Sequence, residues 1–204
     1  MLDTFRFFIM NAMKLLFPYY RSFRKFSKAK TGFSYLDFLR FKIFGSKTYW
    51  GQEQNCQVVN PRKIVVGFNS PIGRTGSYIQ GAGTIHIGNY VQLGPNVGII
   101  SANHGLYDQK ETIEGPIKIA DYCWIGMNSV VTAGVELGPR TIVGAGSVVT
   151  KSFPEGYCLI AGSPAKIIKH LDKDKFVPWH EEEEYYGFLT KEEFFKKRKK
   201  YLDI

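Results

Sequence analysis

The sequence has few of the features that mark disulfide-rich, metal-binding or membrane-spanning proteins. Its 204 residues include three cysteines, Cys56, Cys123 and Cys158, which cannot form a complete disulfide set and contain no CxxC pair. No run of 18 apolar residues occurs, so no ordinary transmembrane helix is predicted. The first 20 residues lack a cationic segment before their apolar stretch and a small-residue cleavage site, so we expect no signal peptide. These absences favour a cytoplasmic protein with reduced thiols.

Proline and, near the N-terminus, acidic side chains are also scarce. Nine prolines against 21 glycines exclude collagen-like and proline-rich classes. Residues 1–50 hold ten Lys or Arg and two acids, residues 51–160 hold seven of each sign, and residues 161–204 hold ten basic and nine acidic side chains. A nucleic-acid enzyme carries positive charge around its chemistry, so the neutral centre argues against nucleic acid as a partner. The length fits one domain with short extensions.

An aliphatic residue recurs every six positions in the middle of the chain. The series is Ile119, Ile125, Val131, Leu137, Val143 and Val149, preceded by Ile87, Leu93 and Ile99, with a second row of Ile79, Ile85, Val91 and Val97. This period fits neither an isolated helix nor a long alternating strand. It fits a short strand and a turn, repeated, with one aliphatic side chain pointing inward each time. Sandwich strands recur at about 8–12 residues, so a β-sandwich is disfavoured, and a right-handed β-helix is the other alternative.

The repeat breaks once, between Ile99 and Ile119, which are 20 residues apart. The intervening residues 103–116, NHGLYDQKETIEGP, are polar and aperiodic, so we expect a loop ejected from the coil. Long loops inside compact repeats are usually functional. His104 lies where this loop begins, and an imidazole can exchange a proton near neutral pH. The alternative is a loop histidine that caps a turn.

The in-phase hexads, the polar excursion and the segment AGSPAK at 161–166 resemble the hexapeptide-repeat acyltransferases over roughly residues 60–170. The resemblance implies an all-β fold, a left-handed parallel β-helix over 56–170. A basic amphipathic extension would occupy 1–55 and a helical tail 171–204. It also implies a homotrimer with sites between adjacent subunits.

The resemblance further implies roles for single residues. By position His104 is the general base, which would deprotonate an acceptor hydroxyl as it attacks the thioester of acetyl-CoA. A backbone N–H near Met127 would stabilise the oxyanion. Asn103 and Trp124 are assigned to the acceptor pocket. The residues assigned to acetyl-CoA are Met127, Ala145, Thr150, Lys151, Lys166 and Lys169. No metal is implied.

Several of these assignments have plain structural alternatives. The group that orients His104 could be Asp108, Glu111, Glu114 or a backbone carbonyl. Trp124 could pack at a subunit contact. Ala145 and Thr150 could be ordinary repeat positions, and the lysines ordinary surface charges.

The ends of the chain add weaker indications. Residues 1–30 combine apolar side chains at helical spacing with basic ones, which suits a helix packed on the β-helix or one lying on an anionic membrane. The sequence TKEE at 190–193 is a capping box that predicts a helix start. Its basic run at 196–200 could support oligomer contacts or be solvated.

The expected activity is transfer of acetyl to a sugar hydroxyl of a cell-envelope polysaccharide or its precursor, at the inner face of the cytoplasmic membrane. The acid and Asn motif of the maltose and galactoside enzymes is not seen at residues 74–83. A small-sugar or amino-sugar acetyltransferase is the alternative within the same chemistry. The alternatives of other classes are a zinc-dependent carbonic-anhydrase-like protein, for which His86 and His104 offer two ligands, and a non-catalytic membrane-associated scaffold.

Overall fold

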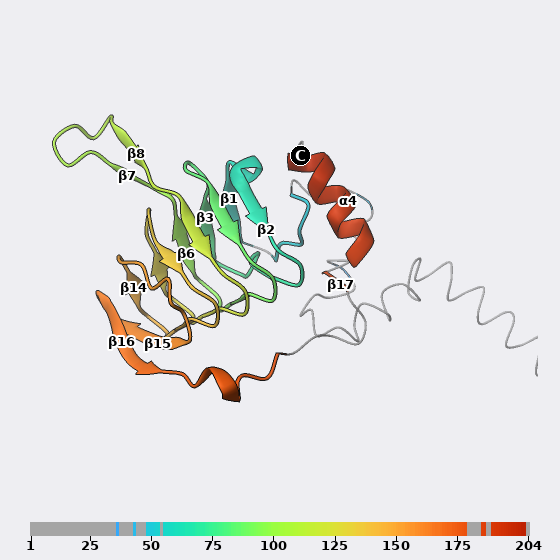
Figure 1. Ribbon diagram of the computed structural model, residues 1–204. Helices are drawn as coiled ribbons and strands as arrows, with labels where there is room; N and C mark the ends of the chain where they lie inside the picture. The colour runs from blue at the N-terminus through green and yellow to red at the C-terminus, as the bar shows by residue number, and fades with distance from the viewer. Residues whose placement is uncertain are drawn as a thin grey trace, which may run out of the picture.

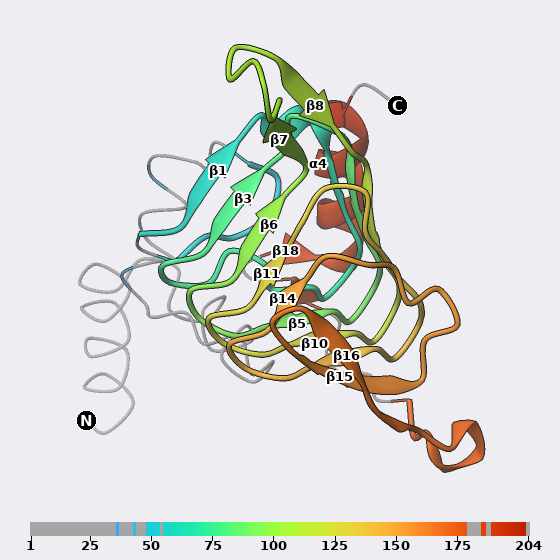
Figure 2. The same ribbon diagram turned by 90° about the vertical axis from the view of Figure 1, so that its left-hand side faces the viewer.

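Strands of two to six residues alternate with turns and return repeatedly to three faces of a column (Figures 1 and 2). The computed structural model describes residues 36, 43, 48–53, 55–178, 185, 186 and 189–202. The first face holds β1 (Gln57–Val59), β3 (Tyr78–Gln80), β6 (Gly98–Ile100), β11 (Val130–Val131) and β14 (Val148–Val149). The second holds β2 (Ile64–Val66), β4 (Ile85–Ile87), β9 (Ile117–Ile119) and β12 (Glu136–Leu137). The third holds β5 (Gln92–Leu93), β10 (Trp124–Ile125), β13 (Ile142–Val143), β15 (Cys158–Gly162) and β16 (Ala165–His170). A short 3₁₀ helix, η1 (Pro61–Lys63), precedes β2.

The six-residue row forms the inner ladders of this column. Val131 pairs with Ile99 and Val149 on the first face, and Ile125 pairs with Leu93 and Val143 on the third. Each of these side chains is buried, and each contributes about 1.5–3 kcal/mol by leaving water. Six residues therefore carry the chain from one face to the next, and pairing between successive coils is parallel. The predicted left-handed parallel β-helix is confirmed.

The second upstream row does not form a separate ladder throughout. Ile79 pairs with Ile99 and continues the ladder of the first face. The coil from Ile79 to Ile99 is 20 residues long, whereas the coil from Val131 to Val149 is 18 residues long. The difference arises because the turn at 81–84 has two residues more than the equivalent turn between β11 and β12. A strict six-residue period does not reveal residues that are inserted at a turn.

The interrupted stretch leaves the column as a hairpin. β7 (Ala102–His104) and β8 (Thr112–Glu114) pair in antiparallel register and project from the column between β6 and β9 (Figures 1 and 2). The sequence predicted the ejected segment but not its strands, since its polar residues show no alternation. We call residues 102–114 the arm.

The C-terminal part turns back along the column. After β15 and β16, which pair antiparallel, the chain passes through η2 (Lys173–Lys175) and later forms β17 (Tyr185–Tyr186), β18 (Leu189–Thr190) and α4 (Lys191–Leu202). The predicted capping box is present, because the Thr190 N–H donates to Glu193 Oε2 and the Glu193 N–H to Thr190 Oγ1. Of the predicted helical tail, only η2 and α4 are helical among the described residues.

α4 packs against the first coil and covers that end of the column (Figure 1). Phe194 is fully buried, with its ring centroid 5.6 Å from Tyr49 and 6.0 Å from Phe68. Arg198 Nη1 donates to the Val66 carbonyl at 3.2 Å. One face of the helix therefore packs into the core of this chain, while Lys196, Lys197, Lys199 and Lys200 are exposed.

The expected N-terminal amphipathic helix falls on residues 1–30, which lie outside the described residues. The described chain begins to join the column near Trp50, which is fully buried, and at Gln52, which bridges to Gly73. No helix within the described ranges has both the length and the apolar character needed to cross a membrane.

Burial of Cys123 makes stability depend on pH. The thiol donates to the Gly138 carbonyl, and desolvation raises its pKa to about 12. An unfolded thiol ionises near pH 9, so the stabilisation is complete below pH 9 and is lost as pH rises toward 12. Between pH 8 and pH 10.5 we expect urea midpoints to report a fall in unfolding free energy that is smaller in Cys123→Ala by on the order of 1–2 kcal/mol. Equal falls in both proteins would contradict this account.

Candidate functional site

The candidate residues lie at two corners of the column. The arm corner, between the first and second faces, bears Asn103 and His104 on β7 and, further along the stack, Thr150 and Lys151. The Met127 corner, between the third and first faces, bears Met127 and Ala145. Every coil passes both corners, so each set forms a row along the column.

His104 is oriented by a backbone carbonyl. Its Nδ1 lies 2.8 Å from the carbonyl oxygen of Gln109 across the arm. A carbonyl oxygen can only accept, so Nδ1 carries the hydrogen in this arrangement and Nε2 keeps its lone pair. His104 is exposed, which leaves Nε2 open to a substrate.

The arm is held in this shape by hydrogen bonds near its tip. The Gly105 N–H donates to the Glu111 carbonyl at 3.0 Å, and the Glu111 N–H to the Asp108 carbonyl at 3.1 Å. A Cβ on Gly105 would lie 2.6 Å from the Asp108 carbonyl oxygen, so the residue after His104 must lack a side chain. The Asp108 carboxylate accepts from the Lys110 N–H. Of the four orienting groups considered from the sequence, the structure therefore provides the backbone carbonyl.

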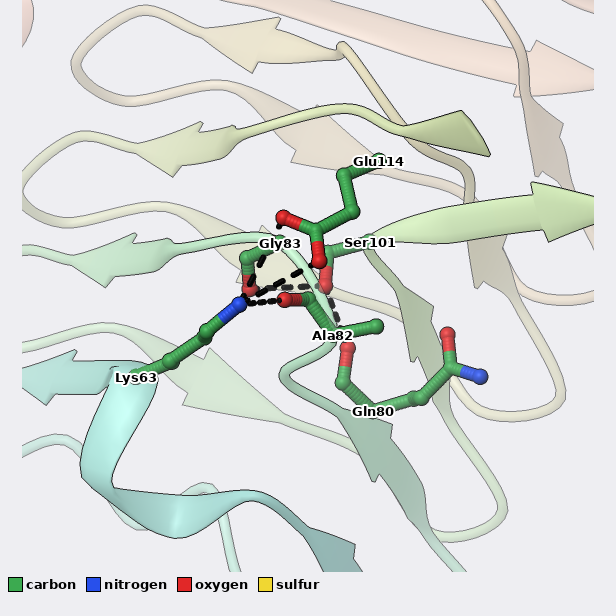
Figure 3. Close-up of polar contacts among 6 residues, drawn as sticks. All are labelled: Lys63, Gln80, Ala82, Gly83, Ser101 and Glu114. Atoms are coloured by element: carbon green, nitrogen blue, oxygen red, sulfur yellow. Dashed lines mark hydrogen bonds and ion pairs between the residues drawn. The ribbon is translucent and has the colours of Figure 1, made fainter. Parts of the chain in front are cut away.

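The root of the arm is anchored by Ser101 and Lys63 (Figure 3). Ser101 is fully buried, and its Oγ lies 2.5 Å from the Gln80 carbonyl oxygen and 2.9 Å from that of Gly83. Lys63 Nζ, from η1, donates to the Ala82 carbonyl and lies 3.3 Å from Glu114 Oε1 on β8. These contacts connect the arm to two earlier coils.

The Met127 corner brings several predicted residues together. The Gly146 N–H donates to the Met127 carbonyl at 2.9 Å, which stacks Met127 on the turn that contains Ala145. Lys166 on β16 pairs with Ala161, which lies against Gly144. The Met127 N–H has no hydrogen-bond partner among the described residues, so it is available as a donor.

The two corners do not meet within one chain. Trp124 lies on β10 of the third face and Lys169 on β16 of that same face, whereas His104 projects from the arm corner. The first face separates the two rows. Asn103 and Trp124, which the sequence assigns to one acceptor pocket, therefore lie apart within a single chain, because the arm and β10 belong to different parts of the column.

Sequence reasoning missed Gln109, Lys63 and Ser101. Gln109 acts through its backbone carbonyl, which any residue type would supply. Lys63 is 51 positions from Glu114, and only the stacking of coils brings them together. As to metals, the described parts of the chain contain no group of three His, Cys, Asp or Glu side chains placed to hold an ion.

Comparison with known proteins matches the family described as bacterial transferase hexapeptide (six repeats) over residues 116–151. The chain is 33% identical over 132 residues to galactoside O-acetyltransferase of Escherichia coli (strain K12), covering 60% of this chain and 64% of that protein. It spans between 45% and 64% of the length of the first two curated relatives it matches.

Two solved structures share the fold. One is a hexapeptide-repeat acetyltransferase of Vibrio cholerae O1 biovar eltor complexed with acetyl coenzyme A, with a TM-score of 0.59, 28% identity and coverage of 74% of this chain and 86% of that one. The other is a maltose O-acetyltransferase of Clostridium difficile 630, with a TM-score of 0.54, 29% identity and coverage of 62% and 71%. The resemblance to hexapeptide-repeat acetyltransferases is thus confirmed in both sequence and fold.

Removing the Lys63 anchor should loosen the arm while leaving the column intact. In Lys63→Met the Ala82 carbonyl and the Glu114 carboxylate lose their cation, but this half-exposed pair is worth at most about 1 kcal/mol. We expect amide hydrogen exchange in residues 102–114 to rise severalfold, while exchange of β11 and β14 stays unchanged. Lys118→Met, on the exposed second face, is the control. Unchanged arm exchange in Lys63→Met would show that Ser101 alone holds the root.

Proposed function

We propose that this chain is an acetyl-CoA-dependent O-acetyltransferase that acts on a sugar hydroxyl of a cell-envelope polysaccharide or its precursor. The observation that carries the proposal is the orientation of His104, whose Nδ1 lies on the Gln109 carbonyl and whose Nε2 is left as a base. The relatives named above supply the donor, since one of them was solved with acetyl coenzyme A.

The reaction follows from these groups. His104 Nε2 takes the proton of the acceptor hydroxyl as its oxygen attacks the thioester carbon, so a C–O bond forms and the carbonyl becomes an oxyanion. The Met127 N–H, which has no hydrogen-bond partner among the described residues, would donate to that oxyanion. When the C–S bond breaks, the imidazolium returns its proton to the departing CoA thiolate. No covalent enzyme intermediate is needed.

The donor would lie along the Met127 corner. Ala145 leaves space for a close approach to the backbone, and Lys166 and Lys169 on β16 supply cations for phosphates. Thr150 and Lys151, at the arm corner, would contact the donor from the other side. Asn103 and Trp124 would contact the acceptor.

Because His104 and Met127 lie at different corners, we infer that the site forms between subunits of a homotrimer. The arm corner of one subunit would face the Met127 corner of the next. Leu106 is 93% exposed at the arm tip beside the fully exposed Tyr107. Exposed apolar side chains of this kind suit contact with another surface, and one repeated contact closes a three-fold ring.

Two classes of sugar are candidates for the acceptor. The relatives named for maltose and galactoside make a small sugar the second candidate. Residues 74–83 differ from the acceptor motif of those enzymes, which favours a larger envelope sugar. Contact of the basic N-terminal segment with the inner face of the cytoplasmic membrane would bring the enzyme to such an acceptor.

The His104→Ala variant tests the chemistry. We expect kcat to fall roughly 10²–10⁴-fold, as for the loss of a general base, with acetyl-CoA binding and sedimentation unchanged. CoA release would be measured with polysaccharide from the organism's own envelope and with maltose and a galactoside. His86→Ala, an exposed histidine on the second face, is the matched control. Full activity in His104→Ala would exclude it as the base.

A calorimetric titration with acetyl-CoA tests the donor site. We expect about one site per subunit and an affinity reduced roughly 10- to 150-fold in Lys166→Ala, since a charge-assisted contact contributes roughly 1.5–3 kcal/mol. Lys118→Ala, which removes an equal charge from the second face, should bind as wild type. Absence of binding by the wild-type protein would leave the fold standing, contradict the acetyl-CoA assignment and favour the scaffold alternative.

A further inference from the structure

The third corner of the column, between the second and third faces, bears bulky side chains where the turns favour small ones. Its turn positions, all with φ between 44° and 59°, are Asn69, Tyr90, Tyr122, Arg140 and Tyr157. This left-handed conformation is unfavourable for a residue with a bulky side chain. The equivalent positions at the Met127 corner are Gly76, Asn96, Asn128 and Gly146, which adopt it readily. We call the third one the aromatic corner.

Packing explains part of the occurrence of bulky side chains at the aromatic corner. The rings of Tyr90 and Tyr122 stack at 5.1 Å with an interplanar angle of 6°. Phe176, from the segment that follows β16, packs edge-on to Tyr122 at 5.1 Å, and the Arg140 guanidinium lies 5.2 Å from the Phe176 centroid. The corner thus holds the returning C-terminal segment.

Two open cavities adjoin this corner, and Arg140 lines both. One, of about 320 Å³, lies between β16 and the returning segment and is lined by Arg140, Tyr157, Lys169, Asp172 and Lys175, among others. The other, of about 270 Å³, lies over the third face and is lined by Gln92, Tyr122, Trp124 and Arg140, among others. We call the pair of cavities the Arg140 groove.

The groove combines positive charge with ring faces. Arg140 and Lys175 contribute two cations, whereas Lys169, which also lines the groove, is already assigned to the donor phosphates. Among the described lining residues Asp172 is the one acid, already 3.4 Å from Lys175 Nζ. Arginine pairs with carboxylates and phosphates through two parallel hydrogen bonds. Trp124, 54% exposed, offers an apolar ring face of the kind that packs against a sugar.

The groove also leads toward the proposed site of chemistry. Trp124 begins β10, and β10 runs directly into the Met127 corner. A ligand that covers Trp124 therefore has one end near the Met127 N–H and the other near Arg140 and Lys175.

We propose that the Arg140 groove binds an anionic oligosaccharide, so that the acceptor is a sugar chain bearing carboxylates. This rests on the proposed function for the identity of the acceptor site. The sugar ring nearest the reacting hydroxyl lies on Trp124, and the following units place their carboxylates against Arg140 and Lys175.

Calorimetric titrations of the full chain test the groove directly. The probes are two carboxylated chains, hexagalacturonate and hyaluronate hexasaccharide, and the neutral maltohexaose. We expect at least one carboxylated chain to bind more tightly than maltohexaose, and its affinity to fall about tenfold in Arg140→Asn. Asparagine accepts the left-handed turn, so this variant removes the charge without straining the corner. Arg140→Lys should recover part of the affinity, and Lys118→Gln, with its charge on the second face, should behave as wild type.

Three results would overturn the proposal. Equal affinity for charged and neutral chains would exclude charge recognition. Equal affinity of wild type and Arg140→Asn would exclude the groove. Loss of hexasaccharide binding in saturating CoA would assign the groove to the donor nucleotide.

The binding test of the groove and the activity test of the proposed function can succeed or fail independently. Binding of a carboxylated chain is measured in the wild-type protein without acetyl-CoA, so it is scored apart from acetyl transfer. If binding holds while no acetyl is transferred, the groove stands and the acetyltransferase proposal fails. If acetyl is transferred to neutral sugars alone and Arg140→Asn has no effect, the proposed function stands and the groove fails.

Discussion

Parallel stacking of one coil on the next is the constraint on which the rest of this molecule depends. Each strand inside the stack pairs its backbone N–H and C=O groups with the coils on either side, so such a coil can neither shift nor rotate without unpairing its neighbours. The inward ladders through Ile99, Val131 and Val149 follow from this register. The rows of residues along each corner follow from the same register, since every coil must turn at the same three places.

The same constraint explains where the chain can be interrupted. Residues inserted into a strand would break two pairings, whereas residues inserted at a corner leave both flanking strands in register. The arm illustrates this, because β9 still pairs with β4 and β12 after the excursion. The longer turn at 81–84 is a smaller case of the same rule. A corner is therefore where a histidine can leave the column without disturbing the core.

The six-residue period predicted the ladders because an inward position must be filled by a buried aliphatic side chain in every coil. The ejected arm was predicted for the opposite reason, since it breaks the period. A backbone carbonyl was among the candidates to orient His104, but the sequence did not indicate that it belongs to Gln109. The Lys63–Glu114 contact and the rings around Arg140 were not predicted. Each depends on which coils are neighbours, and a backbone carbonyl leaves no signature in the sequence. The separate corners of His104 and Trp124 likewise follow from the face that each strand occupies.

Rigidity of the column has a consequence for catalysis. The Met127 corner is fixed by hydrogen bonds to adjacent coils, so the proposed oxyanion donor and the proposed donor-binding row need no rearrangement. The arm, which carries the proposed base, stands outside the stack, and Ser101 and Lys63 anchor its root. The position of its tip relative to the column therefore depends on the surface that the tip contacts. If that surface is a second subunit, the distance between His104 and the thioester is set by subunit packing, and an isolated chain has both halves of the chemistry without the means to combine them.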